Sequence, residues 1–161
     1  GGPVRGRALG TGGGSEVTGL PKQFFNITFL PPREFFQRTF AGAEYRVIGE
    51  DDVGNFVGEA GNGTVYLLDT AEGADHPLVY LARDRRTLAA AVKIYRRHRG
   101  MAMAAAFLSA LVHRGGDNEE EQARKEAAGL GEKLSALDPE MFRDEFTFWS
   151  PLLEEIEWGM L

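Results

Sequence analysis

Hydrophobic and polar positions alternate with a strand-like period in the first half of the chain and with a helical period in the second half. The stretch 24–30 (FFNITFL) is aromatic and β-branched, which is typical of a strand. It stops at Pro31-Pro32, which cannot continue a strand ladder. We therefore expect one strand over 24–30. The next stretch, 33–40, fits a short helix and irregular structure equally well.

Four further runs have the composition of strands. Asn62-Gly63 separates two of them, and this dipeptide is a strong hairpin signal because both positions tolerate a positive φ. Polar loops separate the others. Because the connections are short, consecutive strands are expected to form an antiparallel meander. The four runs are 44–49, 53–59, 64–69 and 78–81.

After residue 84, apolar positions recur every three or four residues, which predicts helices. Asp84 or Thr87 is expected to cap the first helix. Gly100 is expected to break or kink it, and Gly115-Gly116 to end the apolar segment that follows. The first apolar stripe consists of Leu88, Ala91, Val92 and Tyr95.

Two more helical segments complete the pattern. The first has an acidic first turn, as the helix dipole favours, and is expected to be capped by Asp117 or Asn118. Asp138-Pro139 predicts a turn or the start of a short helix. The stretch 146–161 predicts a last amphipathic helix. Strands followed by helices predict an α+β fold, with an antiparallel sheet and helices packed on one side of it.

The chain length of 161 residues fits one domain. The Gly-rich stretch 1–18 is expected to be a flexible lead, and 19–161 a single α+β domain. No apolar run approaches the ~20 residues that span a bilayer, and the first residues lack the apolar core of a signal peptide. We therefore expect a cytoplasmic protein that does not bind membranes.

Residues typical of catalysis or cofactor binding are sparse. The chain has no cysteine, which excludes disulfides, a thiol nucleophile and thiolate metal sites. Its three histidines lack the spacing of metal ligands. Phosphate-loop and esterase motifs are absent from the sequence. We therefore expect no enzyme activity, no catalytic residues, no cofactor and no metal.

Charge is distributed unevenly along this acidic chain, whose net charge is −6. The segment 83–99 has seven basic residues and one acid, whereas residues from 117 onward have thirteen acids and four bases. A basic stripe fits nucleic acid or an acidic partner, but two such segments can also neutralise each other on neighbouring helices. The pI of about 5.1 disfavours nucleic-acid binding as the main role.

Several short motifs follow one another in a fixed order. They are GLP at 19–21, IGED at 48–51, FVGE at 56–59, NGTVY at 62–66, LDPE at 137–140, FW at 148–149 and LLEEI at 152–156. This order resembles the SUKH (Smi/Knr-like) superfamily, most closely its fourth group, the immunity proteins of bacterial polymorphic toxin systems. The resemblance covers about residues 19–161. The chain departs from the pattern at 81–84, where an Asn-Ser pair is usual, and at Glu59, where Asp is common.

The resemblance implies a non-enzymatic domain that binds and blocks a cognate toxin, often a nuclease or a nucleic-acid deaminase. A nuclease needs a basic surface to meet phosphates. An inhibitor with an acidic face can occupy that surface and associate faster through electrostatic steering. We therefore expect a basic protein partner, bound by acids in the strand connections and at the sheet edge. The candidate partner-binding residues are Asp51, Asp52, Glu59, Glu72 and Asp75.

Two alternatives remain open. A general SUKH-fold scaffold module would bind several partners more weakly than an immunity protein binds one toxin. A nucleic-acid binder would use the stripe from Arg83 to Arg99, which would have to be exposed, contiguous and not paired with the acids after Asp117. The apolar residues of 101–112 are most simply core, but if exposed they would form a dimer face.

Overall fold

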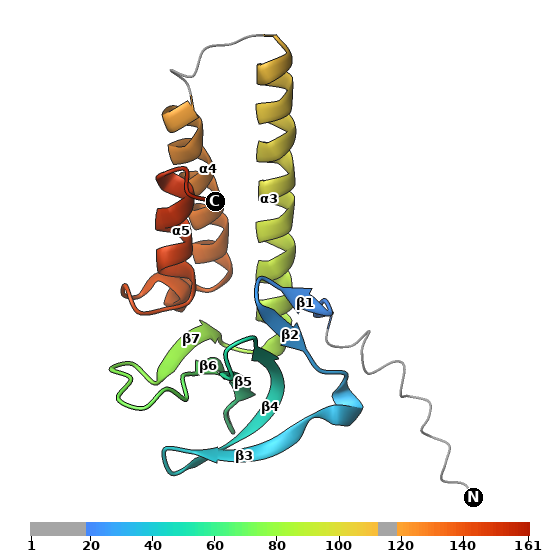
Figure 1. The fold of residues 1–161 in the computed structure, drawn as a ribbon, viewed down its shortest axis with the longest axis vertical. Coiled ribbons are helices and arrows are strands. Elements are labelled where there is room, and N and C mark those ends of the chain that lie inside the picture. Colours follow the sequence, from blue (N-terminus) through green and yellow to red (C-terminus); the bar gives the residue numbers. More distant parts are fainter. Residues whose placement is uncertain (1–18, 113–118) are drawn as a thin grey trace, which may run out of the picture. The chain divides into compact units, whose positions relative to one another are not determined.

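An antiparallel sheet forms the first part of the described chain and helices form the rest, so the fold is α+β as predicted (Figure 1). The computed structural model describes residues 19–112 and 119–161. The chain divides into two compact units, one up to Ala89 and one from Ala90. We call them the sheet unit and the helical unit and describe each by itself.

The described strands form one curled sheet of seven strands, and every pair in it is antiparallel. The strand order is β1-β2-β4-β5-β6-β7, with β3 paired to β4 off this path. The predicted meander is therefore confirmed, with two more strands than expected. The strands are β1 (Gln23–Phe24), β2 (Ile27–Phe29), β3 (Phe36–Phe40), β4 (Ala43–Asp51), β5 (Phe56–Glu59), β6 (Val65–Leu68) and β7 (Leu78–Ala82).

The single strand predicted over 24–30 is wrong. The chain reverses at Phe25 and Asn26, so that Phe24 pairs with Ile27 across a two-residue turn. Phe25 has a φ of 55° there. Composition does not reveal this turn, because a positive φ is unusual for any residue other than Gly, Asn or Asp.

The ambiguous stretch 33–40 resolves into two elements. It begins in the short 3-10 helix η1 (Pro32–Glu34) and continues as β3. β3 then turns into β4 at Ala41 and Gly42, whose φ values are 52° and 85°. Two consecutive positive φ values match the right-handed twist of the paired strands and close the hairpin tightly.

The predicted hairpin at Asn62-Gly63 is confirmed. The Asn62 side-chain oxygen accepts the backbone N–H of Thr64 at 3.0 Å, and Gly63 has a φ of 93°. The backbone N–H of Ala60 donates to the Thr64 carbonyl at 2.9 Å and closes the loop between β5 and β6.

The buried side of the sheet unit is apolar. Tyr45, Tyr66 and Tyr80 form an edge-to-face row across the sheet, with ring centroids 6.3 and 6.2 Å apart. Gly58 lies on the strand between Tyr45 and Tyr66, and a Cβ there would come within 3.1 Å of the Tyr45 Cβ. Fully buried side chains are Val47, Ile48, Val57, Val65 and Leu68.

The first helix starts where the sequence predicts. The Asp84 carboxylate accepts the backbone N–H of Thr87 at 2.7 Å and so caps α3 (Arg85–Leu111). The predicted break at Gly100 is wrong, because α3 runs through it without interruption. One glycine costs a helix only about 1 kcal/mol, which a helix of this length tolerates. The predicted stop at Gly115-Gly116 lies outside the described residues.

The remaining described helices are α4 (Glu119–Leu137), the 3-10 helix η3 (Pro139–Phe142) and α5 (Trp149–Glu157). The caps predicted at Asp117 or Asn118 lie outside the described residues. Asp138 caps η3, because its carboxylate accepts the Glu140 backbone N–H at 3.2 Å. The predicted short helix at Asp138-Pro139 is therefore confirmed.

Within the helical unit, α4 packs against α5 and η3. The buried residues include Leu130, Leu134, Met141, Trp149 and Ile156. Arg99 of α3 forms an ion pair with Glu126 of α4, in which the Arg99 Nη1 donates to both carboxylate oxygens at 2.8 and 2.7 Å. In the described ranges, no helix combines the length and the apolarity needed to cross a membrane.

Candidate functional site

Two loops of the sheet unit emerge at the same end of the sheet. β5 begins at Phe56, which pairs with Leu68 at the end of β6, and Leu68 pairs with Leu78 at the start of β7. The β4–β5 and β6–β7 connections therefore lie side by side. The backbone N–H of Thr70 donates to the Asn55 side-chain oxygen at 3.0 Å and joins them. We call residues 50–55 and 69–77 the acidic end.

The acidic end has six acids and neither Lys nor Arg. Basic side chains in these loops would offset the negative charge of the acids, but the two loops contain no Lys or Arg. A surface of this composition produces a negative potential that attracts a basic partner. The six acids are Glu50, Asp51, Asp52, Asp69, Glu72 and Asp75.

Asp51 holds the first loop in shape. Its carboxylate accepts the backbone N–H groups of Val53 and Asn55 at 3.0 and 2.8 Å and the Asn55 side-chain amide at 2.9 Å. The residue is only 9% exposed. Its geometry is that of a residue that supports the loop rather than one that meets a partner directly.

Three of the predicted acids are exposed at this end: Asp52, Glu72 and Asp75. Asp52 also accepts the side-chain amide of Asn26 at 2.8 Å. This hydrogen bond brings the β1–β2 turn alongside the β4–β5 loop. The structure therefore collects exposed acids that are up to 23 residues apart in sequence on one surface.

Two exposed apolar residues border these acids, and neither is among the residues predicted from the sequence. Val53 is 74% exposed between Asp52 and Asn55, and Phe25 is 41% exposed in the turn next to Asn26. Phe25 also has the positive φ that costs a non-glycine residue energy, a feature that concentrates at functional sites. No pattern signals either residue, because their exposure depends on turns that only the folded sheet defines.

Glu59 lies apart from the other four predicted acids, at the opposite end of β5. The expected position at the sheet edge is wrong, because β4 and β6 pair with β5 on both sides. Its side chain is only 10% exposed and forms ion pairs with Arg85 and, at 4.0 Å, with Arg46. The Arg85 guanidinium also lies over the Phe35 ring, 5.3 Å from its centroid.

Glu59 lines a polar hollow of about 670 Å³ in the sheet unit. Its lining includes three acids and three bases, so their charges largely offset one another. Glu44, Glu59 and Asp84 supply the acids, and Arg46, Arg85 and Arg86 supply the bases. The hollow therefore lacks the uniform negative charge of the acidic end.

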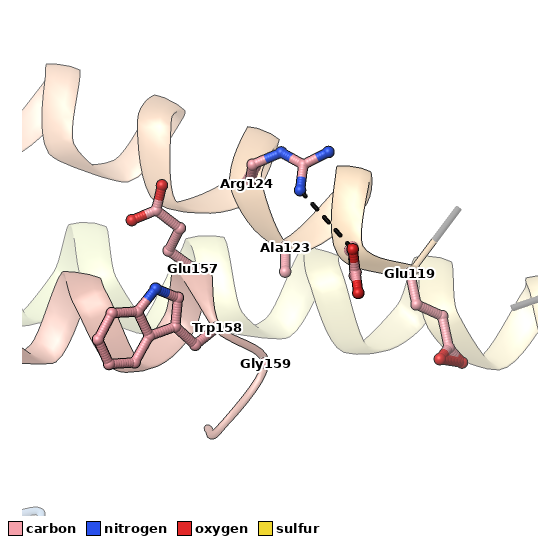
Figure 2. Close-up of a pocket in the computed structure, with 7 residues that line it drawn as sticks. Glu119, Ala123, Arg124, Glu157, Trp158 and Gly159 are labelled. Carbon is pink, nitrogen blue, oxygen red and sulfur yellow. Dashed lines mark ion pairs between the residues drawn. The ribbon is translucent and has the colours of Figure 1, made fainter. Parts of the chain in front are cut away.

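A second hollow, of about 550 Å³, lies in the helical unit between the start of α4 and the end of α5 (Figure 2). Its lining includes Glu157 at the end of α5, the following residue Trp158, and Arg124 of α4. Arg124 pairs with Glu120 at 4.0 Å. Trp158 is 67% exposed, so this hollow is an open surface feature and not an enclosed pocket.

In the described part of the chain, Asp84, Tyr95 and His98 have shifted pKa values, and none of them lies in the acidic end. The backbone hydrogen bond from Thr87 lowers the pKa of Asp84, as expected of a helix cap. Burial raises the pKa of Tyr95. Burial, reinforced by Lys133, lowers the pKa of His98. Across 19–112 and 119–161, no three His, Asp or Glu side chains are grouped so that they could hold a metal ion.

The stripe from Arg83 to Arg99 is interrupted by ion pairs. Arg99 is paired with Glu126, one of the acids after Asp117, and Arg85 is paired with Glu59. The neutralisation expected between the basic and acidic segments therefore occurs at Arg99. Nucleic-acid binding through the stripe requires a continuous basic surface. Two of the seven basic residues of the stripe are held in these ion pairs, which interrupts that surface.

Comparison with known families identifies one match. A family model described as SUKH-4 immunity protein matches residues 15–155, which is most of the chain. No curated protein and no solved structure matches the chain.

Proposed function

The chain belongs to the SUKH-4 immunity protein family, and we propose that it protects the cell by binding a cognate toxin without catalysing a reaction itself. The observation that carries this proposal is the family match over residues 15–155. Immunity by binding needs a surface that complements the toxin, and we propose the acidic end as that surface.

In this proposal, Asp52, Glu72 and Asp75 contact basic side chains of the toxin. All three are exposed, and no Lys or Arg in their loops competes for them. Phe25 and Val53 would lie within the contact as apolar anchors. Charges of this kind mainly accelerate association and select the partner, whereas desolvated apolar contacts supply much of the affinity.

Asp51 and Glu59 would serve the same function indirectly. Asp51 accepts three hydrogen bonds within the β4–β5 loop and would fix the position of its neighbour Asp52. Glu59 pairs with Arg85 and would stabilise the sheet unit at the other end of β5. Neither needs to touch the toxin for its loss to weaken binding.

The acidic end favours a toxin whose working surface is basic. A nuclease or a nucleic-acid deaminase has such a surface, because it must attract a phosphate backbone. An acidic protein that covers that surface excludes the substrate without needing to enter the catalytic centre. We therefore propose a toxin that acts on nucleic acid.

Co-expression with the toxin encoded by the neighbouring reading frame tests the proposal. We expect the wild-type chain to restore growth and to co-purify with the toxin as a stable complex. A toxic neighbour that is neither bound nor neutralised would contradict the pairing. Weak binding to several unrelated proteins, with no rescue, would favour a scaffold role instead.

A further inference from the structure

The second half of α3 is apolar, uncharged and open to solvent. Residues 100–112 contain no Asp, Glu, Lys or Arg. They nevertheless carry six large apolar side chains, each between 60% and 67% exposed. These are Met101, Met103, Phe107, Leu108, Leu111 and Val112. We call them the α3 patch.

The spacing of the α3 patch is that of a helix–helix seam. Met101, Leu108 and Leu111, with the small Ala104 between them, recur at intervals of three and four residues. This is the repeat with which two helices interlock. Arg99 reaches Glu126 of α4, so its side of α3 faces α4, and Met103, one turn further on, lies at the margin of the patch on that side.

The area of the patch is of the size that a dimer requires. At 60–67% exposure, each of the six side chains presents on the order of 100 Å². Together they present roughly 600 Å², and a stable interface buries about 800 Å² on each partner. This area is at the upper end of the range of about 300–600 Å² for the largest apolar patch on a typical soluble monomer, and such patches often mark an interaction site.

We propose that the α3 patch is the interface between two copies of this chain, which pack their α3 helices against each other about a two-fold axis. A second copy offers the same uncharged and apolar surface, which a two-fold interface requires. The patch uses residues of the helical unit and none of the acidic end, so this inference is independent of how the toxin binds.

Charge favours an antiparallel arrangement of the two helices. Lys93, Arg96 and Arg97 come directly before the patch on α3 and are exposed. A parallel pair would place these bases beside their own copies, which repel. An antiparallel pair moves them to opposite ends of the interface, where each set lies near the C-terminal end of the partner's α3. In the sequence, the acidic first turn of α4 comes after that end.

Sedimentation or light scattering of the full chain tests the interface. We expect wild type to have twice the chain mass of 17.7 kDa at micromolar concentrations.

Leu108→Glu and Met101→Glu should each weaken association by at least about a hundredfold, because each buries two carboxylates in the interface. Met160→Glu is the matched control, since Met160 is 66% exposed and Met101 67%, but Met160 lies outside the patch. Circular dichroism should show that all three variants are folded.

A monomeric wild type at about 100 μM would overturn the proposal, as would a dimer that Leu108→Glu leaves intact. If wild type is monomeric and Leu108→Glu abolishes toxin binding, the patch belongs to the toxin interface instead. Because the chain has no cysteine, single-cysteine variants report the orientation directly. Phe107→Cys, near the middle of the patch, should form a disulfide-linked dimer readily, and Met101→Cys at its end should not. The reverse order would contradict the antiparallel arrangement.

Discussion

Gly49 of β4 pairs with Phe29 of β2. A Cβ at this position would be 2.8 Å from the Thr28 carbonyl oxygen, which belongs to the neighbouring backbone and cannot move aside alone. The IG motif at 48–49 therefore has a physical cause, because a residue larger than glycine would push the two strands apart.

We predict that Gly49→Ala lowers the free energy of unfolding by about 1–3 kcal/mol, the usual cost of overpacking. Urea denaturation measures this directly. Gly61→Ala is the matched control, because nothing lies within 4 Å of its Cβ position and its φ is not positive. A Gly49→Ala variant as stable as Gly61→Ala would contradict the strand geometry.

His98 is a half-buried imidazole whose Nε2 has no hydrogen-bond partner among the described residues. Burial lowers its pKa, Lys133 and Arg97 lower it further, and Glu126 opposes them. The folded state therefore binds a proton at His98 less readily than the unfolded state does. Stability from this residue is fully present above pH ~6.5 and is lost as the pH falls below that value.

We accordingly predict that wild type loses stability between pH 6.5 and 5 more steeply than His98→Gln does. Urea denaturation at a series of pH values compares the two slopes. Glutamine removes the titrating group while it keeps a polar side chain of similar size. Equal slopes in the two proteins would show that the imidazole titrates alike in the folded and unfolded states.

Among the helices, α4 contains two glycines that differ in their surroundings. A Cβ on Gly129 would make an ordinary contact of 3.5 Å with the His98 ring, whereas a Cβ on Gly131 would come within 2.9 Å of a terminal methyl of Leu153. Glycine inside a helix costs about 0.5–1 kcal/mol relative to alanine. Only one of the two sites can recover that energy without displacing a neighbour.

We predict that Gly129→Ala raises the free energy of unfolding by about 0.5–1 kcal/mol. Gly131→Ala should gain less or lose stability, because Leu153 must shift. Thermal or urea denaturation of the two single variants gives the comparison. A larger gain at Gly131 than at Gly129 would be inconsistent with the packing of α4 on α5.

Elements that depend on local chemistry could be predicted from the sequence. The Asn62-Gly63 hairpin, the Asp84 cap and the Asp138 cap each follow from side chains that bond to nearby backbone groups. The β1–β2 hairpin could not be predicted, because Phe25 takes a positive φ that its residue type disfavours. The break predicted at Gly100 is wrong because a long helix tolerates one residue of low helix propensity.

The candidate site, like the fold, can be predicted from the sequence only in part. Loop acids such as Asp52 and Glu72 could be proposed from sequence, because a meander places alternate connections at one end of its sheet. The ion pair of Glu59 with Arg85 could not, because it joins residues 26 positions apart through the fold. The exposure of Phe25 and Val53 likewise appears only once the turns are formed.

At the scale of the whole molecule, charge is segregated. The acidic end gathers six acids without Lys or Arg, while several bases of the helical half lie among acids that offset them, as Arg99 does with Glu126. In the proposed function, the acidic end attracts the basic surface of the toxin. Such steering weakens as salt screens charges beyond the Debye length, about 8 Å at physiological ionic strength.

The affinity of charge-reversed variants for the cognate toxin, measured by calorimetry, tests the central claim most directly. The test variant carries Asp52→Lys, Glu72→Lys and Asp75→Lys. The control carries Glu121→Lys, Glu132→Lys and Glu154→Lys, three exposed acids of α4 and α5 whose reversal changes the net charge equally. We predict that the test variant binds at least about a hundredfold more weakly and that the control stays within about threefold of wild type. Equal affinities for the two variants would show that the toxin binds elsewhere and would contradict the account.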